Sequence, residues 1–560
     1  MALTLLPDWL AAEIPGPFAA MLLAGTVGRD HLLRVAAMAG AQAQATAGAA
    51  REKWLRRRVG LLAAAFEEDS LYGPGAQALA QALAEAAPGT EPPDSAFAAL
   101  VTELARAFRI PENTAYYQRL LAAGDAARID AYLENECARG PHTLFWLHVA
   151  LRRAVLARDF ERGQRLVGSA LPEALAALGP KLRADLALLA GRPDQAQALY
   201  EASLALAPRP LGRFRAGLAA RQAGDVVAAA AHLAAALAAL PEHASAALAL
   251  YDLATGWDRA TAPLPQSVAI ALYTFNKAAD CDATLASLFA SAIGDARVTV
   301  LDNASRDATP EVLAAWQDRV GPERLTLIRL PVNIGAPAAR NWLAADPRVG
   351  EAAFVAYLDD DVDLPQDWLA RLFAARTAYP DAGVWGCRVL DAANAAVAQG
   401  VGALFVPGQE SDGEAALPWF GDAHAESFDF GAFAHLRPCL SVMGCCHLFQ
   451  TERLRAAGGF DIRYSPSQYD DVDHDLRLAL SGHPAVYQGH LAVRHRRPAP
   501  VFAPSRPDQL AAGEANRSKL LAKLGGRFGE LTAIMRRVAR EDLAAKWRAL
   551  AVAGLTAPGS

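Results

Sequence analysis

The sequence predicts an all-α region followed by an α/β domain with a mostly parallel sheet. Up to about residue 255 the chain is rich in Ala and Leu, with Gly and Pro confined to short interruptions, which is typical of helices. Beyond that point β-branched, apolar runs alternate with polar loops and helical segments. A length of 560 residues exceeds what one hydrophobic core usually serves, so two to four domains are expected.

Composition excludes several classes of protein. Lys and Arg total 54 against 60 Asp and Glu, so no basic excess favours a nucleic-acid partner. The six cysteines show neither zinc-ligand spacing nor the density of a disulfide scaffold, which indicates a reduced, cytoplasmic setting. The N-terminal residues lack a basic leader, and polar residues interrupt the most apolar segment, residues 226–251, so we expect neither a signal peptide nor a transmembrane segment.

The helical region contains a periodic turn signal. Gly124, Arg158, Gly191 and Gly224 occupy turns at intervals of 34, 33 and 33 residues. A helix-turn-helix unit of this length resembles the tetratricopeptide repeat, and an irregular helical bundle is the alternative. We therefore expect a helical region without a period over residues 1–110 and tetratricopeptide-like repeats over 111–258. Such repeats suggest a surface for a protein partner.

Residues 267–277 are an apolar, β-branched run that ends in turn residues. Three further segments, residues 297–316, 325–345 and 352–373, each have the order strand, loop, helix. This succession predicts a parallel sheet with helices on its faces. Ligands bind such sheets beyond the carboxyl ends of the strands, where each of these polar loops begins.

Asp359, Asp360 and Asp361 directly follow the apolar run of the fourth segment. Carboxylates brought together at a strand end repel unless they are protonated or neutralised, and oxygen ligands suit Mg²⁺ or Mn²⁺. A solvated loop leading into a helix N-terminus is the alternative.

Residues 267–497 also carry, in order, motifs similar to those of the family 2 glycosyltransferases with the GT-A fold. These motifs are "ALYTFNK", "VLDNASRDAT", "NIGAPAARN", "YLDDDV" at the place of the DXD motif, and the segment from "GGFDIRYSPSQYDD" to "AVRH". The resemblance implies a nucleotide-binding pocket that includes Thr274, Asn276, Asp302, Arg340, Asp359 and Asp360. It also implies a Mn²⁺ or Mg²⁺ ion held by Asp361, Asp359 and His495; without the family, His495 is an ordinary surface histidine.

The segment "YDDVDHDLRL", residues 469–478, resembles the catalytic motif of the family. Transfer of a glycosyl group needs a base for the acceptor hydroxyl, and we expect Asp471 to be that base and Asp470 to orient the acceptor. The alternative is that these acids only favour a helix N-terminus. The resemblance implies a single base without a nucleophilic carboxylate, and hence direct displacement with inversion at the anomeric carbon.

Other expectations concern the acceptor side and the end of the chain. Gly444 is expected to allow close backbone approach, and Trp419 and Phe420 either stack on a sugar ring or belong to the core. The GT-A domain is expected over residues 266–500, and C-terminal helices with a tail over 501–560.

The sequence therefore predicts an inverting, metal-dependent glycosyltransferase of hexosyl type. Its expected donor is a UDP-, dTDP- or GDP-linked sugar, and its acceptor a glycan or protein. A rival reading is a helical-repeat scaffold with an inactive transferase-like domain. A nucleotidyltransferase is a second rival, but "YTFNKAAD" is not the Gly-rich, basic phosphate loop that it would carry.

Overall fold

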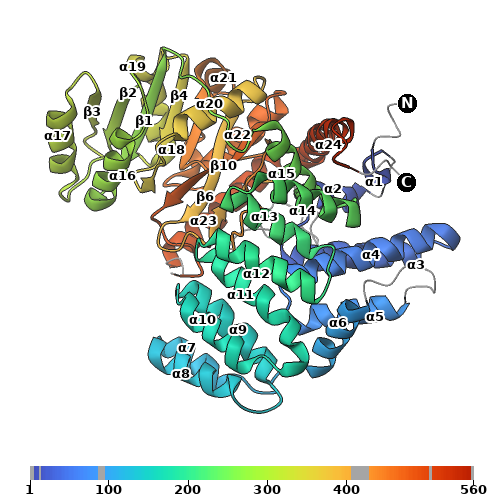
Figure 1. Ribbon diagram of the computed structural model, residues 1–560. Helices are drawn as coiled ribbons and strands as arrows, with labels where there is room; N and C mark the ends of the chain where they lie inside the picture. Colours follow the sequence, from blue (N-terminus) through green and yellow to red (C-terminus); the bar gives the residue numbers. More distant parts are fainter. Residues whose placement is uncertain are drawn as a thin grey trace. The chain divides into compact units, whose positions relative to one another are not determined.

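The computed structural model describes residues 6–11, 14, 16–85, 95–404, 428–502 and 507–556. The chain divides into two compact units, Met1–Ala254 with Phe428–Ala432 and Lys546–Ser560, and Thr255–Ser427 with Phe433–Ala545. We call them the helical unit and the α/β unit. The expected all-α region followed by an α/β domain is confirmed (Figure 1). Trp419 and Phe420 lie outside the described residues.

The helical unit is built from α-helices and one 3₁₀ segment within its described residues. Their bounds are α1 Asp8–Ala11, α2 Gly16–Ala24, α3 Arg29–Gln44, α4 Gly48–Glu68, α5 Gly73–Glu85, α6 Ser95–Ala107, α7 Ala115–Ala123, α8 Ala126–Cys137, α9 Thr143–Leu156, α10 Phe160–Ala170, η2 Glu173–Leu178, α11 Gly179–Leu189, α12 Pro193–Leu206, α13 Gly212–Ala223, α14 Val226–Ala239 and α15 Ala244–Thr255. The helices α7 to α14 form successive pairs, each joined by a short turn.

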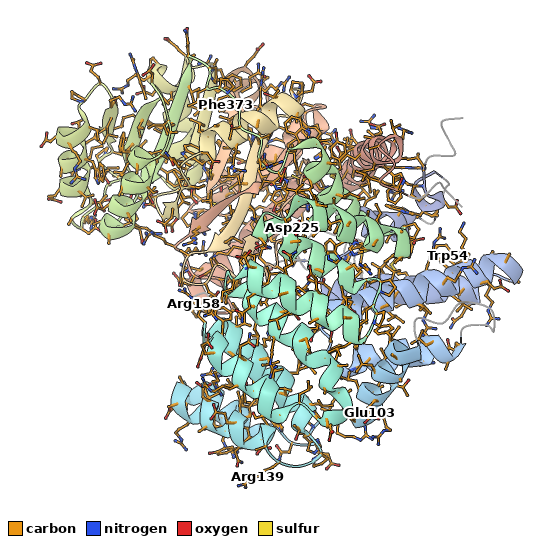
Figure 2. The ribbon with its side chains drawn as sticks, viewed as in Figure 1. Trp54, Glu103, Arg139, Arg158, Asp225 and Phe373 are labelled. Carbon is orange, nitrogen blue, oxygen red and sulfur yellow. The ribbon has the colours of Figure 1, made fainter. Side chains whose placement is uncertain are left out.

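The turn positions expected from the sequence are the turns of these pairs. Gly124, Arg158, Gly191 and Gly224 all have positive φ, between 56° and 84°, which reverses the chain after the first helix of each pair. Asp225, which is labelled in Figure 2, then accepts a hydrogen bond from the backbone N of Ala228 and caps α14. Asp125 and Asp159 cap α8 and α10 in the same way. The helix pairs are thus present, and their identification as tetratricopeptide repeats stays a prediction.

The short segment Phe428–Ala432 is part of the helical unit although it lies far along the sequence. The Arg215 guanidinium stands 3.4 Å from the ring centroid of Phe430. Gln222 donates from Nε2 to the carbonyl of Phe430 at 2.9 Å, and Arg221 donates to the carbonyl of Gly431 at 2.6 Å. An aromatic anchor and two backbone contacts therefore hold this segment among the helices.

The α/β unit is a mixed sheet with helical crossovers. Its strands are β1 Val268–Thr274, β2 Arg297–Asp302, β3 Leu325–Arg329, β4 Phe354–Leu358, β5 Val362–Asp363, β6 Val384–Asp391, β7 Ala398–Gly400, β8 Leu436–Cys439, β9 Cys446–Gln450 and β10 Ala485–His495. Its helical segments are α16 Ala278–Ala290, α17 Thr309–Val320, α18 Ala336–Ala345, α19 Pro347–Gly350, α20 Trp368–Ala378, α21 Thr451–Ala456, η4 Ile462–Tyr464, α22 Asp470–Leu480, α23 Pro507–Leu524 and η5 Gly525–Arg527; α24 spans Phe528–Val552.

The strand order is β3-β2-β1-β4-β9-β6-β10-β5, with β7 added to β6 and β8 to β10 (Figure 1). The half from β3 to β4 is entirely parallel, because the crossovers α16, α17 and α18 each return the chain to the same end of the sheet. The antiparallel strand β9 separates this half from the parallel pair of β6 and β10. Apolar side chains of both halves form the core. Because β1, β2, β3 and β4 run parallel, the polar residues that follow them gather at one edge of the sheet.

No helix among the described residues is long and apolar enough to cross a membrane.

Candidate functional site

The aspartate cluster follows β4 at the carboxyl end of the parallel strands. The backbone N of Asp359 donates to the carbonyl of Cys445 at 2.9 Å, and its carboxylate accepts from the hydroxyl of Tyr273 at 3.0 Å. Asp361 is 4% exposed, and β5 begins directly after it. The cluster is therefore held between strands and is not the solvated loop of the alternative reading.

Strand pairing brings His495 to Asp361. In the antiparallel pair of β10 and β5, His495 lies opposite Val362, the residue after Asp361. Its Nε2 is 3.0 Å from Oδ1 of Asp361. One ligand atom each from Asp359, Asp361 and His495 all lie within 4.8 Å of one another. Two carboxylate oxygens and an imidazole nitrogen are a suitable donor set for Mn²⁺ or Mg²⁺ with further water or phosphate ligands, so these residues fit a divalent cation.

A lysine that the sequence reasoning did not single out also contacts this cluster. The Nζ of Lys277 forms an ion pair with Oδ2 of Asp361 and lies 3.9 Å from Oδ1 of Asp360. Lys277 follows β1, and its ion pair is with a residue 84 positions away in the sequence. The sequence offered one signal for this contact, because Lys277 is a basic residue in a loop at the same sheet edge as the aspartates.

Burial and charge set the protonation of the cluster. Burial raises the pKa of Asp360 to about 7, although the Lys277 ammonium opposes the shift. Burial also acts to raise the pKa of Asp361, but His495 and Lys277 together hold that pKa well below its ordinary range. Burial is the largest single effect on His495 and lowers its pKa, but Asp361 and Asp359 together raise that pKa by more, so the net shift is upward. The metal-free cluster thus pairs an ionised Asp361 with cationic partners.

Three of the residues expected to bind the nucleotide lie at the end of β1, in the loop after it and at the end of β2. Thr274 is the register partner of Asp302, and both are buried. Asn276 has φ of 53° and donates its backbone N to the hydroxyl of Ser305, whose own backbone N donates to Oδ1 of Asp302 at 2.8 Å. Ser305 therefore ties Asn276 to Asp302 at one end of the site.

Arg340 lies deeper, between the aspartate cluster and α22. Its Nη2 is 3.4 Å from Oδ1 of Asp359, and its Nη1 is 2.5 Å from Oδ2 of Asp470. It also donates to the carbonyl of Gly444 at 3.1 Å. The hydrogen bonds and ion pairs described for its guanidinium are therefore with Gly444 and with residues expected to bind the metal or orient the acceptor, and Asp302 is not among them. The ring centroids of Tyr273 and Phe460 lie 5.3 Å from the guanidinium.

Asp470 and Asp471 begin α22 and differ in environment. Asp470 is 2% exposed, and burial raises its pKa even though Arg340 opposes the shift. Asp471 is less buried, and its Oδ2 accepts from the backbone N of Gly444 at 2.9 Å. A Cβ at position 444 would lie 2.8 Å from that oxygen and 2.9 Å from Nη2 of Arg340, so only glycine fits this approach.

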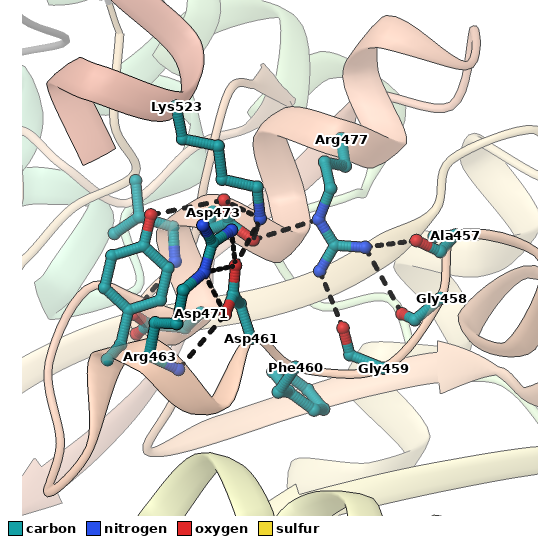
Figure 3. A network of polar contacts seen from close by, with 12 residues as sticks. Ala457, Gly458, Gly459, Phe460, Asp461, Arg463, Asp471, Asp473, Arg477 and Lys523 are labelled. Atoms are coloured by element: carbon teal, nitrogen blue, oxygen red, sulfur yellow. Dashed lines mark hydrogen bonds and ion pairs between the residues drawn. The ribbon is translucent and has the colours of Figure 1, made fainter. Parts of the chain in front are cut away.

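The remaining acids of α22 anchor the helix: Asp475 accepts from the hydroxyl of Ser441 and the backbone N of Val442, and Asp473 binds basic side chains. Asp473, which is fully buried, binds Nε of Arg477 at 2.9 Å and Nζ of Lys523 at 2.7 Å (Figure 3). Arg477 also donates to the carbonyls of Ala457, Gly458 and Gly459 (Figure 3). Helix α23 therefore holds the N-terminus of α22 through an ionic network, and the acid cluster has both a structural and a candidate catalytic part.

One family model matches part of the α/β unit. Residues 269–399, from β1 to β7, match the model of the family described as Glycosyl transferase family 2. No curated protein matches the chain.

Several solved structures are similar to part of it. A mannosyltransferase, PcManGT from Pyrobaculum calidifontis, in complex with GDP-Man and Mn²⁺ has a TM-score of 0.32 and 18% identity, and the match covers 58% of this chain and 99% of that one. GalNAc-T7 with UDP, GalNAc and Mn²⁺ has a TM-score of 0.32 and 13% identity, covering 51% and 59%. Residues 1–349 of TarS from S. aureus, in complex with UDP, have a TM-score of 0.29 and 15% identity, covering 41% and 59%. The family match over β1 to β7 and the strand order confirm that the α/β unit has a GT-A fold and resembles the family 2 glycosyltransferases over residues 269–399.

Proposed function

We propose that the α/β unit transfers a sugar from a nucleotide-diphosphate sugar to a hydroxyl group of an acceptor. The observation that carries this proposal is the position of Arg340. We call Asp359, Asp361 and His495 the cation triad. The Arg340 guanidinium contacts Asp359 of this triad at 3.4 Å, and it contacts Asp470, the neighbour of the candidate base, at 2.5 Å. The groups needed to hold a donor diphosphate and to activate an acceptor thus meet at one arginine.

Donor binding is assigned to the edge formed by the loops after β1, β2 and β4. Asp302 accepts a hydrogen bond from the base, and Thr274 and Asn276 line the pocket. Asp360 reaches the ribose. Asp359, Asp361 and His495 hold Mn²⁺ or Mg²⁺, which when bound offsets the negative charge that develops on the leaving diphosphate.

Asp471 is assigned the role of general base. The acceptor oxygen attacks the anomeric carbon while the hydroxyl proton passes to a carboxylate oxygen of Asp471. The bond between the anomeric carbon and the phosphate oxygen breaks, and the nucleoside diphosphate leaves with the electron pair. A single displacement of this kind inverts the anomeric configuration, and the proposed enzyme is therefore an inverting transferase of hexosyl type.

Asp470 is assigned an orienting role. Its ion pair with Arg340 and its burial suit a group that fixes the start of α22 and the acceptor side. The proposed base is also held in place, because Oδ2 of Asp471 accepts from the backbone N of Gly444. A base must be held within hydrogen-bond reach of the proton that it removes.

The helical unit is proposed to bind a protein, either as acceptor or as partner, with a glycan acceptor as the alternative. Stacked helix pairs offer extended surfaces for such binding. All six cysteines are free and buried, which supports a reducing, cytoplasmic setting. The proposed domains keep the bounds 1–110, 111–258, 266–500 and 501–560.

The test is binding and hydrolysis of UDP-, GDP- and dTDP-sugars with Mn²⁺ or Mg²⁺, for wild type and Asp361→Ala. We expect one donor to bind and turn over with metal, and Asp361→Ala to abolish turnover. An Asp471→Asn variant should still bind the donor, which separates donor binding from acceptor activation. A folded wild-type protein that binds no donor with either metal would overturn the proposal and favour the scaffold reading.

A further inference from the structure

Gln399 is a side chain that none of the motifs in the sequence includes, and it contacts the imidazole of His495. It lies in the short strand β7, which pairs with the end of β6 at an irregular register. Its Oε1 is 2.9 Å from Nδ1 of His495. His495 is in turn the register partner of Asp391 at the end of β6, so the pairing of β6 with β10 and β7 brings the three side chains together.

The orientation of the Gln399 amide is fixed by its other contacts. Its Nε2 is 3.0 Å from Oδ2 of Asp391 and 2.9 Å from the carbonyl oxygen of Arg497. Both partners are acceptors, so the atom that faces them must be the NH₂ group. The amide oxygen therefore faces His495.

Asp391 is itself firmly placed. Its carboxylate accepts from the backbone N of Ala393, Asn394 and Ala499 at 2.8 to 2.9 Å, and it is 1% exposed. It has no freedom to turn away from Gln399 without breaking three hydrogen bonds. The chain of contacts from Asp391 through Gln399 to His495 is thus rigid at its far end.

An amide oxygen only accepts hydrogen bonds, so Nδ1 of His495 must carry a proton. In the metal-free protein Nε2 faces Oδ1 of Asp361 at 3.0 Å, and a carboxylate also only accepts, so both ring nitrogens carry a proton. When a cation takes the place of the Nε2 proton, Nδ1 keeps its proton because it faces the amide oxygen, and the lone pair of Nε2 becomes the ligand. Without the amide oxygen, the ring could instead lose the Nδ1 proton and keep the one that it donates to Asp361, which leaves no lone pair on Nε2 for a cation. Groups that donate or accept behind a metal-bound histidine commonly fix its tautomer in this way.

We propose that Gln399 is a positioning residue for the cation site: its amide oxygen holds His495 in the Nδ1-protonated tautomer and leaves Nε2 as the ligand atom. The inference rests on the proposed function for the existence of the cation site, and adds to it a residue that touches neither the cation nor the donor. Its effect passes through His495 alone.

The first measurement is Mn²⁺ affinity, by titration calorimetry or electron paramagnetic resonance, in the metal-free full-length protein. Gln399→Met keeps the length of the side chain and removes the amide. We expect it to weaken Mn²⁺ binding about 10- to 100-fold. The matched control is Gln317→Met, because Gln317 also lies half-buried in the α/β unit and donates to the backbone carbonyl of Leu325, at the start of β3 and away from the site. Gln317→Met should bind Mn²⁺ as the wild type does.

A double-mutant cycle separates positioning from general damage. In a His495→Ala background, Gln399→Met should cause no further loss of Mn²⁺ affinity, because its effect depends on the imidazole. A loss of equal size in both backgrounds would overturn the proposal and make Gln399 a structural residue of β7. Unchanged Mn²⁺ affinity in Gln399→Met alone would overturn it as well.

The second measurement uses wild type loaded with Mg²⁺, which is diamagnetic. Nitrogen-15 NMR of histidine-labelled protein distinguishes a protonated from an unprotonated ring nitrogen. His495 in the Mg²⁺-loaded protein should carry its proton on Nδ1, and a bare Nδ1 would contradict the proposal even if every variant misfolds. If wild type binds neither Mn²⁺ nor Mg²⁺, the cation site of the proposed function fails, and the role of Gln399 toward a cation fails with it. If wild type binds Mn²⁺ and Gln399→Met binds it with the same affinity, the inference about Gln399 is wrong, while the proposed cation site stands.

Discussion

Arg340 and Asp470 form a buried ion pair that joins the two sides of the candidate site. Nη1 of Arg340 is 2.5 Å from Oδ2 of Asp470, and the two side chains are 4% and 3% exposed. The same guanidinium contacts Asp359 and the carbonyl of Gly444. A change at Arg340 therefore alters both the aspartate cluster and the start of α22.

Replacement of Arg340 by Met should destabilise the α/β unit strongly. It leaves the carboxylate of Asp470 buried without its counter-charge, and breaking one partner of a buried pair typically costs about 3–5 kcal/mol. Denaturant unfolding measures the loss. The double variant Arg340→Met with Asp470→Asn should recover part of this stability, because no unpaired charge then remains. Strict additivity of the two single effects would contradict the pairing.

Much of the fold follows from local sequence. The turns at Gly124 and Gly224 require a left-handed backbone, which glycine adopts readily, so the residue type alone indicates the turn. The apolar runs before Asp302 and Asp359 predict buried strands, and a parallel sheet then places the residues after them at one edge. Short-range signals were sufficient for these features.

The parts that could not be predicted depend on contacts between distant residues. Gln399 reaches His495 across 96 residues of sequence, and only the pairing of β7 and β10 with β6 makes that contact. The place of Arg340 near the nucleotide base stays a prediction, and its described contacts with Asp359, Gly444 and Asp470 join residues up to 130 positions apart in the sequence. Side-chain direction within a packed site is not encoded in motif spacing.

Asp471 and Asp473 should separate catalysis from stability. Asp471→Asn should lower turnover about 100- to 10,000-fold, because an amide cannot take the acceptor proton, while the unfolding free energy changes little. Asp473→Asn should instead lower stability, since Asp473 is fully buried and binds both Arg477 and Lys523 (Figure 3). Steady-state kinetics with the donor identified by the panel, together with thermal melts, provide both readouts. Loss of stability without loss of turnover in Asp471→Asn would contradict the assignment of the base.

His474 should make the protein sensitive to acid. Burial lowers the pKa of His474 to about 3, and its ring stacks on Phe460 with centroids 4.7 Å apart. Between its unfolded pKa near 6.5 and its folded pKa, only the unfolded state takes up the proton, so stability falls as pH falls by about 1.4 kcal/mol per pH unit. Above pH 6.5 the contribution is constant.

The measurement is the difference in unfolding free energy between wild type and His474→Phe at pH 7, 6 and 5. The pKa values of Asp360 and Asp470 are raised, so these groups add stability as the pH falls, opposite to His474. Their contribution is the same in both proteins and cancels in the difference. His474→Phe keeps an aromatic ring and removes the titration, so its advantage over wild type should grow as the pH falls. A difference that does not vary with pH would show that His474 is already solvated or protonated in the folded protein.

Lys277 should compete with the divalent cation for Asp361. Its ammonium is paired with Oδ2 of Asp361, beside Asp360, in the metal-free protein. Lys277→Met removes this counter-charge from a carboxylate that is 5% exposed. Because the lysine side chain is 35% exposed and partly screened, the expected loss of stability is modest, about 1–2 kcal/mol. Without the lysine, the aspartates of the cluster repel one another more strongly, and a bound cation relieves that repulsion. Mn²⁺ should therefore bind up to about tenfold tighter to Lys277→Met and raise its melting temperature more than that of wild type.

The matched control for this prediction is Lys523→Met. Lys523 neutralises Asp461 and Asp473 in the network of Figure 3, away from the cation triad. Its loss should lower the melting temperature of the metal-free protein while leaving the response to Mn²⁺ unchanged. Weaker Mn²⁺ binding in Lys277→Met would contradict competition, because it would mean that the ammonium supports the bound cation or its phosphate ligands. Comparing the two lysines therefore distinguishes a counter-charge that gives way to metal from one that holds the fold.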